Sequence, residues 1–309
     1  MSLEKSRAYG LVLTLVTVAC WGVLPVALKA LLVYMDALTI TWYRFLVAAI
    51  VLGAWLAATG GLPRPRSWSA GAAALLAVAV LGLVGNYVLY LVGLDHVEPG
   101  TAQVVIQLAP MFLLLGGLLV FKEPFRAGQW MGLAALVTGL LLFFHDRLGL
   151  LVSPGSGPGR GVALIVAAAI TWAAYGLAQK KLGGTLSPAS ILFVVYIAAV
   201  PLLLPVSAPA ALLELDWTGL ALLAFCSANT LVAYGCFAEA MKAWEASRVS
   251  AVLAVTPLAT LACVAVAHHW FPDHVPAETV DTLALAGALL VVAGSATTAL
   301  AGRRRRAAA

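Results

Sequence analysis

Two stretches of the sequence, 151 residues apart, decide the fold. Residues 10–29 read GLVLTLVTVACWGVLPVALK and residues 161–180 read GVALIVAAAITWAAYGLAQK, and the two align without a gap. Each copy carries a tryptophan followed eight residues later by a lysine: Trp21 and Lys29, then Trp172 and Lys180. Each copy is also close to the length of apolar chain, about 20 residues, that an α-helix needs to cross a bilayer. The pair indicates that one membrane-spanning motif occurs twice in this chain.

Two further blocks repeat in the same order along the chain. A tyrosine, a glutamate and a proline recur at an offset of 147: Tyr87, Glu98 and Pro110, then Tyr234, Glu245 and Pro257. Two glycines recur at an offset of 155 near the end of each half: Gly132 and Gly139, then Gly287 and Gly294. Three ordered blocks with small changes of offset indicate an internal duplication rather than chance matches.

The composition is that of a membrane protein. Of the 309 residues, 63% are hydrophobic and 10% are charged, whereas a soluble domain has about half and about a quarter. The stretches are continuously apolar rather than alternating, which excludes a transmembrane β-barrel. Ten of them are long enough to predict membrane-spanning helices: Tyr9–Leu32, Ala37–Ala58, Ala70–Leu91, Thr101–Phe121, Ala127–Phe144, Gly161–Leu182, Pro188–Val206, Thr218–Ala240, Val249–Ala267 and Thr282–Ala301.

The duplication predicts the domain organisation. A short segment, 1–8, precedes a first repeat over 9–148, and a Gly- and Pro-rich linker over 149–160 leads to a second repeat over 161–302 and a basic tail, 303–309. Each repeat has five spans, so the second copy enters the membrane from the opposite side. We therefore predict an all-α integral membrane protein of ten transmembrane helices in two inverted-topology five-helix repeats. Such repeats recur in secondary transporters, with the substrate site near the midplane between them.

The basic residues predict the orientation, because cytoplasmic loops of membrane proteins are enriched in lysine and arginine. With both termini cytoplasmic, fourteen of the eighteen basic residues fall on the inner side: Lys5, Arg7, Arg64, Arg66, Lys122, Arg126, Lys180, Lys181, Lys242, Arg248 and Arg303 to Arg306. The linker is then periplasmic. The net charge of +5 follows from this topology, and no nucleic-acid partner is predicted.

Several of these residues resemble a known family pattern. Trp21-Gly22 followed by Lys29, the sequence QLAPMF over 107–112, Lys122-Glu123 and a Gly-rich fifth span are similar to the EamA pattern of the drug/metabolite transporter superfamily. The resemblance implies ten helices and export of amino acids or other small metabolites from bacteria. One departure is visible, since Glu123 has no clear counterpart after the ninth span.

The resemblance does not fix a substrate. We expect a carrier of the bacterial inner membrane that works by alternating access on a small amphipathic metabolite, in contact with lipid and with no obligate protein partner. Multidrug transport, nucleotide-sugar transport and a membrane protein that transports nothing remain alternatives. Direction of transport and ion coupling are not readable from the sequence.

Arg44 is the sharpest candidate for a substrate-binding residue. It lies eight residues into the second span, about 12 Å along a helix that rises 1.5 Å per residue. A charge at this depth costs several kcal/mol and needs a partner. A guanidinium is well shaped to bind a substrate carboxylate or phosphate. The alternatives are a structural ion pair with Asp36 or Glu98, or extension of the side chain toward the membrane surface.

Two amides and three prolines predict a polar opening between the halves. Gln103 and Gln107 lie four residues apart, hence on one face of a helix. Pro110 follows them and frees a backbone carbonyl one turn earlier, and Pro257 does the same at the repeated position. Pro25 predicts a further kink in the first span. Contacts between helices that involve no substrate are the alternative for both glutamines.

Polar and aromatic side chains near the middle of the spans complete the predicted binding site: Trp21, Tyr87, Trp172, Tyr175, Asn229 and Tyr234, with Asn86 and Tyr90 among them. They could form an amphipathic cavity, although any one of them could instead pack against protein or lipid. No catalytic residue, metal site or cofactor is predicted. The glycines of 155–159 follow no strand, and His268, His269, Asp273 and His274 match no defined metal-ligand spacing.

Overall fold

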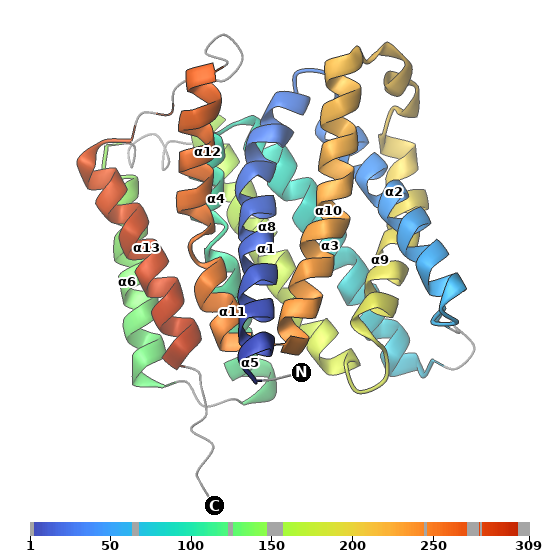
Figure 1. Ribbon diagram of the computed structural model, residues 1–309, viewed down its shortest axis with the longest axis horizontal. Coiled ribbons are helices and arrows are strands. Elements are labelled where there is room, and N and C mark those ends of the chain that lie inside the picture. The colour runs from blue at the N-terminus through green and yellow to red at the C-terminus, as the bar shows by residue number, and fades with distance from the viewer. Residues whose placement is uncertain are drawn as a thin grey trace, which may run out of the picture.

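The computed structural model describes residues 3–63, 68–122, 126–146, 157–243, 246–270, 278 and 280–301. Within these residues the chain folds into helices joined by short connections, with no strand (Figure 1). The helices of the first half are α1 (Leu3–Leu31), α2 (Ala37–Ala58), α3 (Ala70–Asp95), α4 (Pro99–Val105), α5 (Leu108–Phe121) and α6 (Ala127–Phe143). Those of the second half are α8 (Gly157–Leu182), α9 (Pro188–Leu203), η2 (Leu204–Val206), η3 (Pro209–Glu214), α10 (Trp217–Ala243), α11 (Ala246–Leu253), α12 (Thr256–Trp270) and α13 (Thr282–Ala301).

The helices confirm the all-α membrane fold. In the described part of the chain, nine helical stretches are long and apolar enough to cross a bilayer, and α6 adds a shorter apolar helix of 17 residues. Several boundaries differ from the sequence prediction. Among them, α1 already begins at Leu3, α3 continues to Asp95, and α8 begins at Gly157, inside the predicted linker. The rest of that linker and the basic tail over 303–309 lie outside the described residues.

Two predicted spans are each broken into two helices. The fourth span divides into α4 and α5, and the ninth divides into α11 and α12. Each break lies just before a proline, Pro110 or Pro257, which has no N–H to donate to the carbonyl four residues earlier. The freed carbonyls find other donors: Ile106 O accepts from the N–H of Ala109 at 2.9 Å, and Leu253 O accepts from the hydroxyl of Thr256 at 2.5 Å. Pro25, by contrast, lies inside a continuous α1.

The two halves pack through pairs of helices, one from each half, that the repeat relates to one another. α1 packs on α10 and α3 packs on α8, while α6 packs on α13 and α2 packs on α9. Replacing each helix by its repeat partner leaves this set of contacts unchanged, as a two-fold axis requires. Figure 1 shows α6 beside α13 at one side of the molecule and α2 beside α9 at the other. The duplicated sequence therefore folds into two intertwined halves rather than two separate domains.

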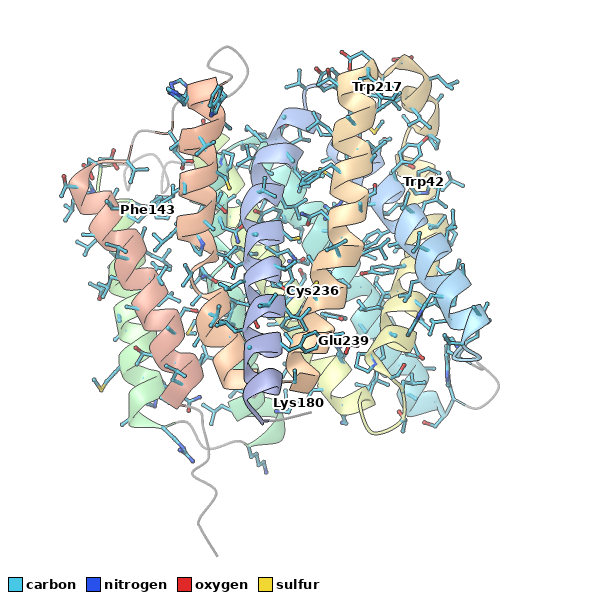
Figure 2. The ribbon with its side chains drawn as sticks, in the orientation of Figure 1. Trp42, Phe143, Lys180, Trp217, Cys236 and Glu239 are labelled. Atoms are coloured by element: carbon cyan, nitrogen blue, oxygen red, sulfur yellow. The ribbon has the colours of Figure 1, made fainter. Side chains whose placement is uncertain are left out.

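The two copies run in opposite directions. α1 begins and α13 ends at the lower edge of Figure 1, and we call this end of the bundle the terminal face. Figure 2 places Lys180, near the end of α8, at this same face, whereas Trp217, at the start of α10, lies at the opposite end, the far face. α1 therefore rises from the terminal face while its repeat partner α8 descends to it.

Glycines allow the closest contacts between the halves. A Cβ atom on Gly132 would lie 2.7 Å from the carbonyl oxygen of Gly294, and one on Gly139 would lie 2.7 Å from that of Gly287. The repeat offset of 155 relates Gly132 to Gly287 and Gly139 to Gly294, so each contact is the symmetry partner of the other. Small residues at such positions let two membrane helices approach closely, where dispersion attraction stabilises the pair. The short α6 is held to the bundle in this way.

Candidate transport cavity

A cavity of about 1060 Å³ lies between the two halves, and both broken spans contribute to its wall. Nine of the twelve residues that the sequence predicts for the site and its kinks line this cavity: Trp21, Pro25, Arg44, Tyr87, Gln103, Gln107, Pro110, Trp172 and Tyr234. The cavity extends to Lys180, near the terminal face. A volume of this size is at the upper end of the range of small-molecule binding sites.

Arg44 is buried in the wall of this cavity and is 4% exposed. Its Nε and Nη2 atoms donate to the hydroxyl oxygen of Thr230 on α10, at 3.1 and 3.0 Å. Its Cζ atom lies 4.7 Å from the centre of the Tyr87 ring, in a cation–π arrangement. These contacts orient the guanidinium without neutralising its charge.

The structural ion pairs that the sequence allows for Arg44 are not formed. Asp36 instead caps α2, where its carboxylate accepts from the N–H groups of Leu38 and Thr39. Within the described ranges, no carboxylate oxygen lies within 4.0 Å of the Arg44 guanidinium. A buried charge without a counter-ion is costly. Arg44 therefore presents an uncompensated positive charge at the cavity wall.

Two aromatic clusters related by the repeat line the cavity, and the side chains of Tyr87 and Tyr234 bring the two clusters together. In one, Trp21 of α1 packs against Tyr234 and Phe237 of α10, with ring centres 5.6 and 5.7 Å apart. The repeat offsets relate these three to Trp172, Tyr87 and Tyr90, and all six side chains line the cavity. The sequence prediction named Tyr90 among the mid-span aromatics of the cavity, but it did not include Phe237. Applying the offset of 147 to the tyrosine and phenylalanine positions would have paired them.

The two broken spans meet at Gln107. Its side-chain amide donates to the carbonyl of Ala254 at 2.9 Å, and Ala254 lies at the break between α11 and α12. Gln103 lies on the other side of the α4–α5 break, where its amide oxygen accepts from the Tyr90 hydroxyl at 3.2 Å. The glutamines thus do not share the face of one continuous helix, yet both are buried at the cavity. Gln107 thus forms a hydrogen bond to another helix and also lines the cavity.

Tyr175, Asn229 and Pro257 do not line the cavity. Tyr175 is 3% exposed and packs in an apolar cluster of α2, α3, α8 and α9, with its backbone and Cβ against Gly82. Although Tyr175 lies three residues after Trp172 and therefore close to the same face of α8, its ring packs in this cluster and not at the cavity. The side chain of Asn229 donates to Cys20 O at 2.9 Å and joins α10 to α1. Pro257 is buried beside the break in the ninth span.

The charged side chains that line the cavity are both cations. Arg44 lies deep in the wall and Lys180 lies toward the terminal face, and no described acidic side chain lines the cavity. The hydrogen-bonding groups Asn86, Gln103 and Gln107 add to the polar part of the wall, and aromatic rings make up much of the rest. This combination fits an amphipathic solute that carries negative charge at one end.

Comparison with known families decides the class. The EamA-like transporter family matches the chain twice, over residues 8–145 and 159–300. The chain belongs to the EamA-like transporter family.

Relatives of this EamA-like chain bear transporter names. It is 38% identical over 307 residues to a protein of Escherichia coli K12 named uncharacterized inner membrane transporter YhbE, with 97% of this chain and 94% of that protein covered. It is 28% identical over 297 residues to a probable amino-acid metabolite efflux pump of Salmonella typhimurium, with 91% and 92% covered. These likenesses mark the chain as a multi-pass membrane transporter rather than an enzyme.

A solved crystal structure shares the fold of this EamA-like chain. It superposes with a TM-score of 0.66 at 18% sequence identity, and the match covers 97% of this chain and 99% of the other. At this identity the likeness concerns the arrangement of helices alone.

Proposed function

We propose that this transporter exports small amphipathic carboxylates, amino acids among them, by alternating access across the bacterial inner membrane. The observation that carries the proposal is Arg44, a buried guanidinium at the cavity wall that contacts Thr230 and Tyr87 and no described carboxylate. A carboxylate at this position would supply the missing counter-charge in a fork geometry. The name of the Salmonella relative, an amino-acid metabolite efflux pump, supports this class of substrate.

The aromatic clusters would contact the apolar part of such a substrate. Rings of α1, α3, α8 and α10 line the cavity, and they offer apolar surface to a solute. Arg44 has no charged counterpart in the second half, because the offset of 151 relates it to Val195, which is fully buried. The polar end of a substrate would therefore bind on the side of α2, while its apolar body contacts both halves.

The same charges disfavour the multidrug alternative. A cationic drug in this cavity would meet Arg44 and Lys180 and no described carboxylate to balance its charge, whereas burial of an unpaired cation is costly. A nucleotide sugar would meet favourable charge, but its diphosphate would have one deeply buried cation, Arg44, to bind. We therefore rank a monocarboxylate first.

Ligand-induced thermal stabilisation in detergent tests the proposal. The purified protein is heated with L-amino acids, with their α-amides, with nucleotide sugars and with cationic drugs. We expect an amino acid to raise the melting temperature and its amide to have no effect, since a ligand at 100 times its Kd stabilises by about 2.7 kcal/mol. Arg44→Met should abolish the response, and Arg126→Met, an exposed arginine at the start of α6, should keep it. Stabilisation by amides or by cationic drugs alone would contradict the proposal.

A further inference from the structure

The hydrogen bond between the two broken spans joins residues that the repeat relates to each other. The offset of 147, which takes Pro110 to Pro257, also takes Gln107 to Ala254. The Gln107 side chain donates to the carbonyl oxygen of Ala254 at 2.9 Å. Two equivalent residues of a two-fold arrangement can touch only where the axis passes close to both. This contact therefore marks the pseudo-two-fold axis at the wall of the cavity, which both residues line.

A second contact between the halves lies on the same axis. Gly132 of α6 approaches the carbonyl oxygen of Gly294 on α13, and Gly139 approaches that of Gly287. The repeat takes each of these two contacts into the other, so the axis passes between them. Figure 1 shows this helix pair at one side of the molecule and α2 beside α9, another pair that the repeat takes into itself, at the other side.

The bond from Gln107 to Ala254 separates two pairs of half-helices. α4 and α12 lie on the side of the far face, and α5 and α11 lie on the side of the terminal face (Figure 1). α4 packs on α12, where a Cβ atom on Gly100 would collide with the Leu261 side chain. α5 and α11, in contrast, both line the cavity, through residues such as Met111 and Ser250. The repeat takes the first pair into the second, so one pair is closed and the other is open.

The geometry of an inverted repeat decides which contacts can persist when access alternates. The second state follows when each repeat adopts the conformation of the other. A contact between residues that are not equivalent, such as Gly100 with Leu261, is then replaced by its counterpart in the other half. The separation of two equivalent residues is carried into itself and does not change. The side chain of Gln107 can therefore keep its partner, Ala254, in both states.

We propose that the bond from Gln107 to Ala254 is the pivot of alternating access. The two broken spans stay joined at this bond in both states, while α4 separates from α12 at the far face and α11 closes on α5 at the terminal face. The bond then stabilises both states equally, whereas the contact of Leu261 with Gly100 stabilises only the state with the far face closed. This inference rests on the proposed alternating access, and it is independent of the solute that is carried.

Labelling of a cavity cysteine from each side of the membrane tests the pivot. The native cysteines are replaced by alanine, and Leu24→Cys in the cavity wall serves as the reporter; the residues replaced are Cys20, Cys226, Cys236 and Cys263. A membrane-impermeant maleimide is added to right-side-out or to inside-out vesicles. The ratio of the labelling rate from the far face to that from the terminal face measures the balance between the two states.

Gln107→Met removes the donor and keeps the length of the side chain. Because a pivot contributes equally to both states, we expect this variant to keep the parental labelling ratio and to melt at a lower temperature than the parent in the same detergent. A bond that belonged to one state alone would instead shift the ratio about tenfold when it is lost. Gly139→Ala, at the second contact on the axis, should behave in the same way as Gln107→Met.

Leu261→Ala tests a contact that the repeat does not take into itself. The substitution removes the side chain that packs against Gly100 of α4, so the state with the far face closed loses stability relative to the other. We expect the labelling ratio to rise several-fold in favour of the far face. Val266→Ala is the matched control, because Val266 lies on the same helix and is exposed, and it should keep the parental ratio.

The outcomes separate the pivot from the substrate assignment, because neither labelling nor melting requires a transported solute. A lower melting temperature with an unchanged ratio in Gln107→Met, together with a raised ratio in Leu261→Ala, supports the proposal even where no amino acid is transported. A shifted ratio in Gln107→Met would overturn it, as would a melting temperature equal to that of the parent. So would an unchanged ratio in Leu261→Ala, because α4 would then not separate from α12. Should Gln107→Met not purify as a single species, Gln107→Asn, which withdraws the amide from Ala254, is measured in its place.

Discussion

The hydroxyl of Thr230 determines where the Arg44 guanidinium lies. It accepts from both Nε and Nη2, while the Thr230 hydroxyl itself donates to Cys226 O at 3.0 Å within α10. Tyr87 supports the same guanidinium from α3. Three helices thus fix the position of one cation, and a binding site is only as specific as the groups that hold its charged residue in place.

Removing that acceptor should weaken substrate binding while leaving the fold intact. We predict that Thr230→Val, which keeps the shape of the side chain, raises the Kd for an amino-acid ligand about tenfold, the scale of one hydrogen bond to a charged group. Thr41→Val is the control, since the buried Thr41 hydroxyl bonds only Ala37 O in its own helix. Binding is measured by thermal shift as a function of ligand concentration. Unchanged affinity in Thr230→Val would show that Arg44 does not need this contact.

Glu278 predicts a pH dependence of the contact that it makes with α4, where it accepts from the N–H groups of Gly100 and Thr101. Burial raises the pKa of this carboxyl above its ordinary value of 4.5, the N–H groups of Gly100 and Thr101 oppose the rise, and nearby Glu98 adds to it. Other titratable groups near Glu278 are Asp146 and Asp281, which line a small cavity with it, and His145, which lies 3.3 Å from Asp281.

The sign follows from comparing the folded with the unfolded protein. In the unfolded chain the carboxyl is hydrated and ionises at its ordinary pKa, so the folded protein binds the proton more tightly. Lowering the pH from neutral toward 4.5 should therefore stabilise the wild type relative to Glu278→Ala, with the effect confined between the ordinary and the raised pKa. Melting temperatures of the two proteins across this pH range provide the measurement. A difference in melting temperature that is independent of pH would exclude titration of Glu278 as the cause.

Among the elements, α6 and α13 depend most on backbone contact. A Cβ added at Gly139 would lie 2.6 Å from Val291 N and 2.7 Å from Gly287 O, whereas one added at Gly235 of α10 would meet nothing within 4 Å. In a helix interior, alanine is intrinsically favoured over glycine by about 1 kcal/mol. The two glycines therefore make a matched pair in which only the space around the Cβ differs.

We predict that Gly139→Ala destabilises the protein by about 1–3 kcal/mol, the cost of overpacking a closely packed site. Gly235→Ala should be neutral or slightly stabilising. Melting temperatures of both variants in the same detergent provide the measurement. Equal melting temperatures would mean that α6 and α13 can separate at Gly139 without loss of stability.

The spans themselves were readable from the sequence, and their breaks were only partly so. Continuous apolar runs predict helices because a bilayer offers the backbone no other hydrogen-bond partners, and the predicted α2 and α13 ranges match their observed bounds. Pro110 and Pro257 predict weakness at the right places. Whether a proline bends a helix or ends it depends on donors from other helices, such as Gln107 at Ala254 O. The sequence of one helix does not contain that information.

The residues of the site, like the breaks in the spans, could be predicted from the sequence only in part. The mid-span polar and aromatic residues predict a cavity wall that includes Arg44 and Trp21, but the face that Tyr175 presents depends on the close packing of α8 on Gly82. Glu278 was missed, although it lies 155 residues after Glu123, the offset that relates the glycines of the last spans. Glu278 is therefore the repeat counterpart of Glu123. It was not recognised because it lies further along the loop, well after the end of the ninth span. Glu123 itself lies outside the described residues.

At the scale of the whole molecule, the duplication was the most informative signal. An odd number of spans in each half makes the second copy run in the opposite direction, and the structure shows α1 and α8 doing so (Figures 1 and 2). The helices follow the repeat, but the polar side chains of the cavity do not. Arg44 and both glutamines come from the first half, and their partners by offset are Val195, Ser250 and Ala254. A symmetric framework thus carries a polar site on one side.

The orientation of this framework in the membrane is a separate prediction. Lys180 lies at the terminal face, and Lys181 and most other basic residues fall in segments that the sequence places on the same side. By the positive-inside rule this face is cytoplasmic. Reporter fusions after Arg306 and within 155–159 test it. We expect the first to be active only as a cytoplasmic reporter and the second only as a periplasmic one, and the reverse pattern would invert the direction proposed for export.

The central claim is that the cavity between the halves carries carboxylate-bearing metabolites by way of Arg44. Counterflow in proteoliposomes tests it most directly, because exchange of labelled for unlabelled substrate needs neither a known direction nor a coupling ion. Vesicles are loaded with unlabelled L-amino acids, and the entry of a radiolabelled L-amino acid mixture is followed. We predict accumulation above protein-free vesicles for the wild type and for Arg126→Met, partial accumulation for Arg44→Lys, which keeps the charge but not the fork, and none for Arg44→Ala. An Arg44→Ala protein that elutes as a single species and exchanges amino acids at the wild-type rate would contradict the claim.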